Sequence, residues 1–244
     1  MTALLRAELL KLRTTRTFVA LTGSAVALSL LVVVLTALLS NDLSEDDVRE
    51  MFLGDFTGLF ILILGVIGMA GEWRHRTITS TVLAAPVRTR LLAAKTLSYA
   101  VAGAVISFIV TATIMAVGTI ILSARDETTA SAGDLANVLW RNLVIAAFFG
   151  GFGVCIGALV RNQIAAIVGL FMVLFAVEPT LIALASHVGQ FGPTSGAPNA
   201  FIELNAFGDD EHQLAPGVAL LVMLGWLALS FGAAATLLRR RDLV

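Results

Sequence analysis

The chain has 244 residues, of which 58% are apolar and only 14% are charged, and its formal net charge is -1. A soluble domain averages roughly 45–50% apolar and about 25% charged residues. The apolar excess lies in long runs, so the composition excludes an ordinary soluble protein and predicts an integral membrane protein. The single cysteine, Cys155, excludes an intrachain disulfide and a cysteine-rich metal site.

Residues 2–16 are predicted to form a short basic helix that lies along the membrane surface. Leu5, Leu9 and Leu12 are spaced i, i+4, i+7, which places them on one helix face among Arg and Lys residues. A plain basic N-terminus that only sets the topology is the alternative interpretation. Residues 17–39 then form the first membrane span, because this run is too long for the apolar core of a signal peptide.

Five further apolar runs complete a predicted all-α protein with six membrane-spanning helices. These runs cover residues 56–71, 95–122, 142–160, 164–188 and 216–238. Small residues let neighbouring membrane helices approach closely, so glycines in the second and fourth spans are predicted to be helix-packing residues. These glycines are Gly65, Gly68, Gly153 and Gly157.

The fifth span carries Glu178 and Pro179 within its apolar run. Proline removes a backbone donor and clashes with the preceding turn, so we expect the helix to kink or break there. Ionisable groups inside a membrane are costly and often functional, and two interpretations of Glu178 stay open. It either faces a cavity as a proton-relay or substrate group, or it is structural. In the structural interpretation it satisfies peptide groups freed by Pro179 or lies near the outer boundary of a broken helix.

Positive charge is segregated between alternate connections. Four Lys and Arg residues lie in 2–16, five in 72–95, one at Arg161 and three in 239–241, whereas only three lie in the remaining connections. The positive-inside rule therefore predicts that both termini are cytoplasmic, as six spans allow.

Residues 72–94 form the longest polar interruption that carries strong positive charge. The charged residues in and beside this loop are Glu72, Arg74, Arg76, Arg88, Arg90 and Lys95. An amphiphilic loop of this size, on the side where positive charge collects, is where a membrane protein would meet a cytoplasmic partner.

The sequence contains no pattern that predicts catalysis. His-Glu-x-x-His and Gly-x-Ser-x-Gly do not occur, nor does the Gly-x-x-x-x-Gly-Lys-Ser/Thr pattern of a nucleotide-binding loop. His75, His187 and His212 fall in different loops and are interpreted as solvated or interfacial side chains. We therefore expect this chain not to be an enzyme, and to hold no cofactor or metal of its own.

The basic loop resembles that of permeases of the type-2 ABC exporter family. The resemblance rests on Glu72-x-Arg74-x-Arg76-Thr77, followed by Pro86, Arg88, Arg90 and Ala94-Lys95. It extends over the whole chain, from the basic N-terminal helix through six spans to the basic C-terminus. The abundance of Ala, Leu, Val and Arg, with just two lysines, suggests an actinobacterial member. In that family the connection after the fifth span commonly re-enters the membrane, as parts of residues 186–214 could do.

The resemblance implies the membrane-spanning subunit of an ATP-driven exporter in the bacterial plasma membrane. Its cargo would be a hydrophobic or amphipathic drug, lipid or peptide-like molecule. Two separate ABC ATPase subunits would bind ATP and Mg, and a second permease chain, identical or different, would complete the transporter. Residues 77–84 would dock into the ATPase through Ile78 and Val82, while the arginines would hold the loop to the partner and to anionic lipids. Nucleic acid is not an expected partner.

Two other classes of function remain open. A stand-alone secondary transporter or channel would show gradient-driven flux that depends on Glu178. In a non-transporting scaffold or sensor subunit, Arg74 and Arg76 could be changed without effect on any transport.

Overall fold

The structure is a computed structural model that describes residues 2–75, 77, 87–160, 162–204 and 213–240. Within these residues the chain is helical and contains no strand. The elements are α1 (Thr2–Thr14), α2 (Arg16–Leu39), α3 (Glu45–Leu53), α4 (Thr57–Arg74), α6 (Arg88–Ala124), α7 (Ala132–Leu159), α8 (Gln163–Met172), the π-helix η1 (Val173–Val177), α9 (Glu178–Leu184), α10 (Ser186–Gly189), α11 (Gly196–Ile202) and α12 (Pro216–Arg240).

Six helical segments of the described chain are long and apolar enough to cross a membrane, which confirms the prediction of a six-span helical protein. They are Arg16–Leu39, Glu45–Arg74, Arg88–Ala124, Ala132–Leu159, Gln163–Leu184 and Pro216–Arg240.

The helix boundaries differ most from the predicted spans at the starts of α6 and α7, and α7 begins at Ala132, ten residues before the predicted start at 142. α6 begins at Arg88 rather than at residue 95, and its 37 residues extend about 55 Å at 1.5 Å per residue. Because the apolar core of a bilayer is roughly 30 Å thick, α6 is longer than one crossing needs. Residues 88–94 of the predicted basic loop therefore form the first two turns of α6. Only residues 75–87 lie between α4 and α6.

Polar side chains fix where several helices begin. Ser44 accepts a hydrogen bond from the backbone N–H of Asp47 at 3.2 Å, and the Asp47 carboxylate accepts one from the Ser44 N–H at 2.9 Å. Ser131 in the same way accepts from the N–H of Asp134, and Asn162 accepts from two N–H groups of α8. These caps satisfy backbone donors that have no partner within their own helix, so the turns between spans can be short.

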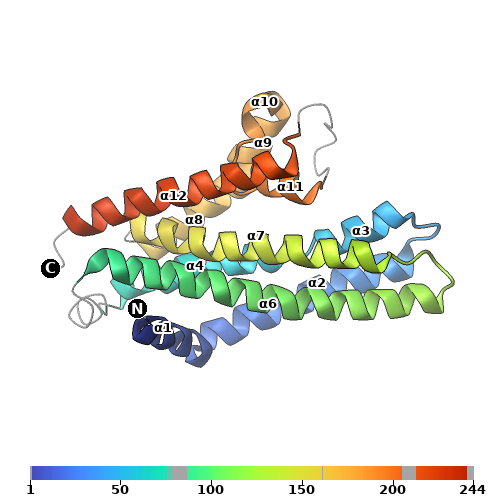
Figure 1. Cartoon of the computed structure of the whole chain (residues 1–244), viewed down its shortest axis with the longest axis horizontal. Helices are drawn as coiled ribbons and strands as arrows, with labels where there is room; N and C mark the ends of the chain where they lie inside the picture. The colour runs from blue at the N-terminus through green and yellow to red at the C-terminus, as the bar shows by residue number, and fades with distance from the viewer. Residues whose placement is uncertain (1, 76, 78–86, 161, 205–212, 241–244) are drawn as a thin grey trace.

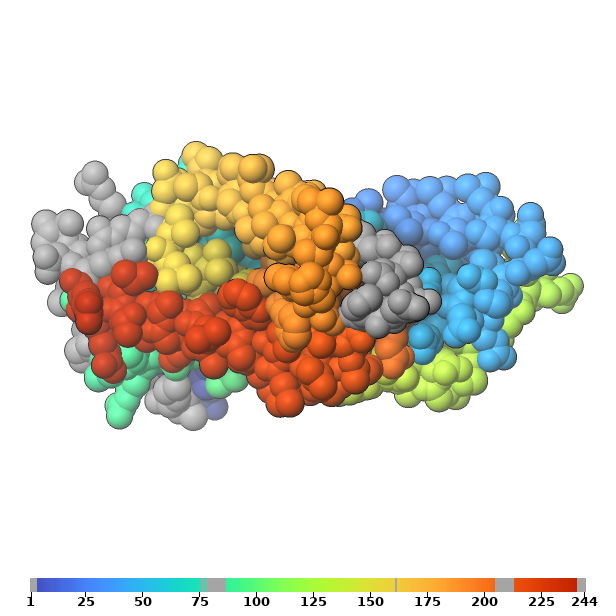
Figure 2. Space-filling view, turned by 90° about the horizontal axis from the view of Figure 1, so that it is seen from above, coloured from blue at the N-terminus to red at the C-terminus, as the bar shows by residue number. Residues whose placement is uncertain are grey.

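Both described ends of the chain lie at one end of the bundle, here termed the termini end (Figure 1). α1, the last turn of α4, the first turn of α6 and the last turn of α12 lie there, whereas α3 and the turn from α6 to α7 form the opposite, far end. Figure 2 shows α8, α9 and α12 covering the termini-end part of one face, with α2 and α3 beyond them.

α4, α6 and α7 form the tightly packed centre of the bundle, and glycines allow their close approach. A Cβ on Gly65 would lie 2.8 Å from a backbone oxygen of α7, and a Cβ on Gly157 would lie 2.7 Å from one of α4. A Cβ on Gly153 would also collide with a backbone oxygen of α4. Gly68 instead faces α6, where a Cβ would overlap the Tyr99 hydroxyl. All four predicted packing glycines thus lie at helix crossings.

Gly153→Ala should lower the free energy of unfolding by roughly 1–3 kcal/mol, the usual cost of overpacking a core. The added methyl meets backbone atoms, which cannot move away without shifting α4 as a whole. Gly225→Ala is the matched control, because Gly225 lies on the exposed side of α12 with nothing within 4 Å of an added Cβ. Thermal unfolding of both purified proteins measures the difference, and an equal response would show that the crossing tolerates a Cβ.

Candidate functional site

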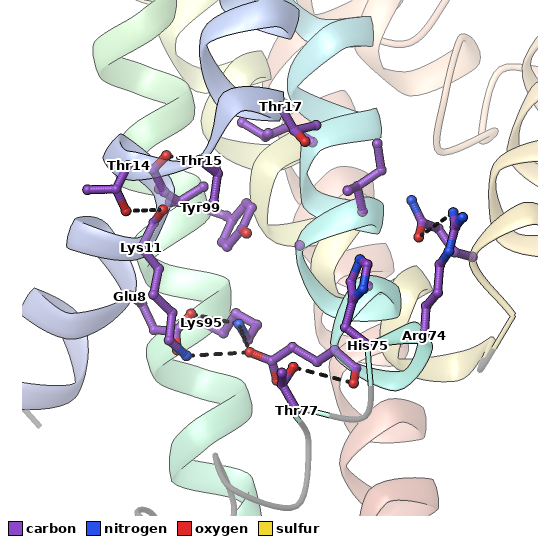
Figure 3. Close-up of a pocket in the computed structure, with 17 residues that line it drawn as sticks. Glu8, Lys11, Thr14, Thr15, Thr17, Arg74, His75, Thr77, Lys95 and Tyr99 are labelled. Atoms are coloured by element: carbon purple, nitrogen blue, oxygen red, sulfur yellow. Dashed lines mark hydrogen bonds and ion pairs between the residues drawn. The ribbon is translucent and has the colours of Figure 1, made fainter.

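Four charged side chains from three helices meet at the termini end, and we call them the ion cluster (Figure 3). The Lys95 Nζ atom of α6 lies 2.6 Å from Glu8 Oε2 of α1 and 2.9 Å from Glu72 Oε1 of α4. Lys11 of α1 lies 3.0 Å from Glu8 Oε1 and 3.6 Å from Glu72 Oε1. Two ammonium groups therefore balance two carboxylates.

The centre of the ion cluster is buried. Lys95 is 2% exposed, and Glu8 and Glu72 are also buried, whereas the Lys11 side chain is 52% exposed. Taking a charge out of water costs several kcal/mol, so these groups are stable in this position only while they remain paired. The cluster therefore fixes α1 against the last turn of α4 and the early turns of α6.

The pKa of Glu8 follows from this environment. Burial opposes ionisation of the carboxyl, but the charge of Lys95 and the hydrogen bonds from Lys95 and Lys11 outweigh it and hold the pKa below its ordinary value of 4.5. Glu8 is therefore ionised at neutral pH, as an ion pair requires.

Further contacts connect the ends of the 75–87 segment to the rest of the bundle. Arg88 donates a hydrogen bond to the backbone oxygen of Leu238, in the last turn of α12, at 2.7 Å. Arg74 donates to the Gln163 side chain at the start of α8, at 3.5 Å. The backbone N–H of Thr77 donates to a carbonyl of the last turn of α4 at 3.0 Å. Both ends of this segment are therefore anchored to other helices.

A cavity of about 760 Å³ lies beside the ion cluster. Figure 3 shows Thr14 and Thr17 from the junction of α1 and α2, His75 from the end of α4, and Tyr99 from α6 around it. One carboxylate oxygen of Glu72, Oε2, is buried and accepts no hydrogen bond from a described residue. The described residues hold no group of three or more His, Cys, Asp or Glu side chains that could bind a metal ion.

The predicted coupling residues fall into two groups. Glu72, Arg74, Thr77 and Arg88 make the contacts given above, while Arg90 lies exposed in the first turn of α6. The remaining coupling residues lie outside the described residues, and they are Arg76, Ile78, Val82 and Pro86.

Glu8 is the site residue that sequence reasoning missed, although the sequence contains a signal for it. It is the only acid in residues 2–16, and its position, three residues after Leu5 and four before Leu12, places it on the leucine face. A lone carboxylate on the apolar face of a helix needs a cationic partner when that face is buried.

Glu178 has a structural contact that neither sequence interpretation named. It is 2% exposed, and its carboxylate accepts hydrogen bonds from the backbone N–H groups of Thr194 at 2.9 Å, Ser195 at 2.5 Å and Gly196 at 3.3 Å. These N–H groups lie at the start of α11, so Glu178 fixes α11 against α9.

Pro179 does not break the fifth span. α8 continues through η1 into α9, and the helical path ends only at Ala185, where φ is -150° and ψ is 68°. The widened π-turn shifts the hydrogen-bond acceptors by one residue, and Pro179 falls in the first turn of α9, where its missing N–H is tolerated. In place of the expected break, the chain forms a π-helix from Val173 to Val177, which ends two residues before Pro179.

These observations define a multi-pass helical protein with six candidate membrane spans and a buried ionic site at the termini end. Comparison with models of known protein families and with curated protein sequences finds no match for the chain. The resemblance to type-2 ABC exporter permeases therefore stays a prediction from the motif residues.

Lys95→Met should destabilise the protein by about 3–5 kcal/mol, because it leaves Glu8 and Glu72 buried beside each other. Lys11→Met should cost about 1 kcal/mol or less, since the Lys11 side chain is half exposed. Thermal unfolding in detergent measures both effects. The combined variant E8Q/E72Q/K95M should be more stable than K95M alone; if it is not, lost packing rather than unpaired charge explains the effect.

Lowering the pH should weaken the ion cluster and destabilise the folded protein. Because the pKa of Glu8 is lower in the folded protein than its ordinary 4.5, its contribution to stability is complete above pH 4.5 and is lost as the pH falls through the lowered value. Unfolding temperatures measured from neutral pH downward should therefore fall more steeply below pH 4.5 for the wild type than for Glu8→Gln. Parallel curves would contradict this assignment.

Proposed function

We propose that the chain is the transmembrane permease subunit of an ATP-driven exporter of the type-2 ABC class. The observation that carries this proposal is the ion cluster, which joins α1, α4 and α6 close to the two helix ends that the 75–87 segment connects. A partner that displaces this segment acts on all three helices together, because separating them would leave buried charges unpaired.

The mechanism that follows is a lever. Two cytoplasmic ATPase subunits, which bind ATP and Mg, close and displace residues 77–84, which dock on them through Ile78 and Val82. The movement passes directly to α4 and α6, and α7 follows because glycine crossings pack it closely against both. The hydrogen bond from Arg88 to Leu238 carries part of it to α12. The spans thereby change their positions relative to the second half of the transporter.

The distribution of charge supports a cytoplasmic location of the termini end. The helix ends that carry Arg13, Arg74, Arg88 and Arg239 all lie there, and the positive-inside rule assigns such an end to the cytoplasm. The membrane is then the bacterial plasma membrane, and α10 and α11 take the place of the short re-entrant helices that the family commonly has.

A second permease chain would complete the transporter against the exposed side of α8 and η1. Ile164, Val168, Met172 and Phe175 follow one another at intervals of four, four and three residues, and all are more than half exposed. This apolar stripe suits contact with lipid or with a helix of a second copy. The cargo, a hydrophobic or amphipathic molecule, would pass at this interface.

The geometry favours the permease over a secondary transporter that uses Glu178. A proton-relay or substrate carboxylate must be able to exchange partners, whereas the Glu178 carboxylate is held by three backbone N–H groups at the start of α11. Those donors are fixed by the backbone of a helix and its preceding turn. A substrate that bound the Glu178 carboxylate would have to displace these hydrogen bonds each time.

The proposal predicts that an ATPase encoded by a neighbouring gene co-purifies with the chain and is stimulated by it in lipid. Ile78→Asp combined with Val82→Asp should release the ATPase, because two carboxylates cannot occupy an apolar groove without a large desolvation cost. A pull-down from cells that express the chain with its genomic neighbours measures the association.

The matched control adds the same two charges at the far end. Thr128→Asp with Thr129→Asp changes two exposed residues between α6 and α7 and should leave the ATPase bound. Size-exclusion chromatography checks that both variants stay folded. If the wild-type chain purifies alone as a folded protein and binds no ATPase, the permease proposal fails.

A further inference from the structure

A second cluster of polar groups lies at the far end, around the partly buried Asp55 between α3 and α4. Asp55 Oδ1 accepts a hydrogen bond from the N–H of Thr57, the first residue of α4, at 3.0 Å. Asp55 Oδ2 accepts from the Thr111 hydroxyl of α6 at 2.9 Å and from the Asn142 amide of α7 at 3.3 Å. Three helices of the central bundle therefore contribute donors to one carboxylate.

Asp55 differs from the acids of the ion cluster because no Lys or Arg of the described chain forms an ion pair with it. Arg49 and Arg141 both contact Glu203, at 3.3 and 3.1 Å. Arg125 donates to backbone oxygens of α2 and its C-terminal end. All three basic side chains of the far end thus have other partners, and Asp55 is held by neutral donors alone.

Asp55 also lines a cavity of about 410 Å³. Asn142 lies beside it, Phe149 and Phe175 contribute aromatic rings, and Ser195 and Asn199 contribute polar groups near the start of α11. This volume falls within the range of small-molecule sites, which are mostly apolar with a few convergent polar groups. Aromatic rings beside a carboxylate form a favourable environment for an organic cation.

We infer that this cavity binds a lipophilic cation, with Asp55 as its counter-ion and the aromatic rings around its apolar body. The identification of that cation as exported cargo rests on the proposed function, whereas the binding itself does not. The contact with α4 does not require a charge, since the side-chain oxygen of an asparagine can also accept from the Thr57 N–H. Asp55→Asn therefore removes the charge and keeps the contact with α4, although its amide nitrogen cannot accept from Asn142 as Oδ2 does.

The test is equilibrium dialysis of radiolabelled tetraphenylphosphonium against the purified chain in lipid nanodiscs. The wild type should bind this cation saturably and should bind tetraphenylborate, an anion of the same shape, far more weakly. Asp55→Asn should weaken binding of the cation by roughly tenfold or more, because it removes the one charged side chain among the described residues that line the cavity. Asp46→Asn, which removes an exposed carboxylate from α3 at the same end, should leave binding unchanged.

A second variant keeps the inference testable if Asp55→Asn fails to fold. Phe175→Ala removes an exposed ring from η1, so the core stays intact, and it should weaken cation binding by about two- to fivefold. The inference is overturned if the wild type binds both ions equally, or if Asp55→Asn folds and binds the cation as the wild type does.

The outcomes distinguish this site from the proposed function. The dialysis needs no ATPase, and the pull-down needs no cation. An ATPase that co-purifies with a chain that binds no cation contradicts only the Asp55 site. Saturable, Asp55-dependent binding by a chain that no ATPase contacts contradicts only the permease proposal.

Discussion

One buried ammonium group, that of Lys95, holds the termini end of the bundle together. It pairs with carboxylates from two other helices, at 2.6 and 2.9 Å, and it is almost completely removed from solvent. An ammonium has three donors and a compact charge, so it can bind two acceptors that approach from different directions. Without this contact, α1 would lose its ion pair with α6. With it, α1 moves wherever α4 and α6 move.

The fold was predictable from the sequence where the signal is local. Six long apolar runs give six candidate spans, and the glycines of the second and fourth runs lie where α4 crosses α6 and α7. The ion cluster was predictable only in part. Glu72 and Lys95 flank the same basic loop, but Glu8 lies 87 residues before Lys95, and no spacing rule links such distant positions. Only its place on the leucine face of α1 gave a signal.

In the fifth span, the rule that proline disrupts a helix is correct, but the break that it predicts at Pro179 does not occur. Proline does remove a donor at position 179, and a regular α-helix would break or kink there. The chain instead forms five residues of π-helix immediately before α9, so that the proline falls in a first turn. The rule states which hydrogen bond is lost, but the packing of the neighbouring helices decides how the backbone accommodates the loss.

Four acids of the described chain are held in three different ways, and the difference bears on what each can do. Glu8 and Glu72 are neutralised by ammonium groups, so changing either charge disturbs the contact between helices. Glu178 is held by backbone N–H groups, which cannot leave without unfolding the start of α11. Asp55 accepts hydrogen bonds from one backbone N–H and from two neutral side chains, those of Thr111 and Asn142, and it lies beside a cavity without an ion pair to any described cation. Its charge is the one that an incoming ligand could neutralise without dismantling the fold, which is why the ligand site is assigned there and not to the glutamate in the middle of the fifth span.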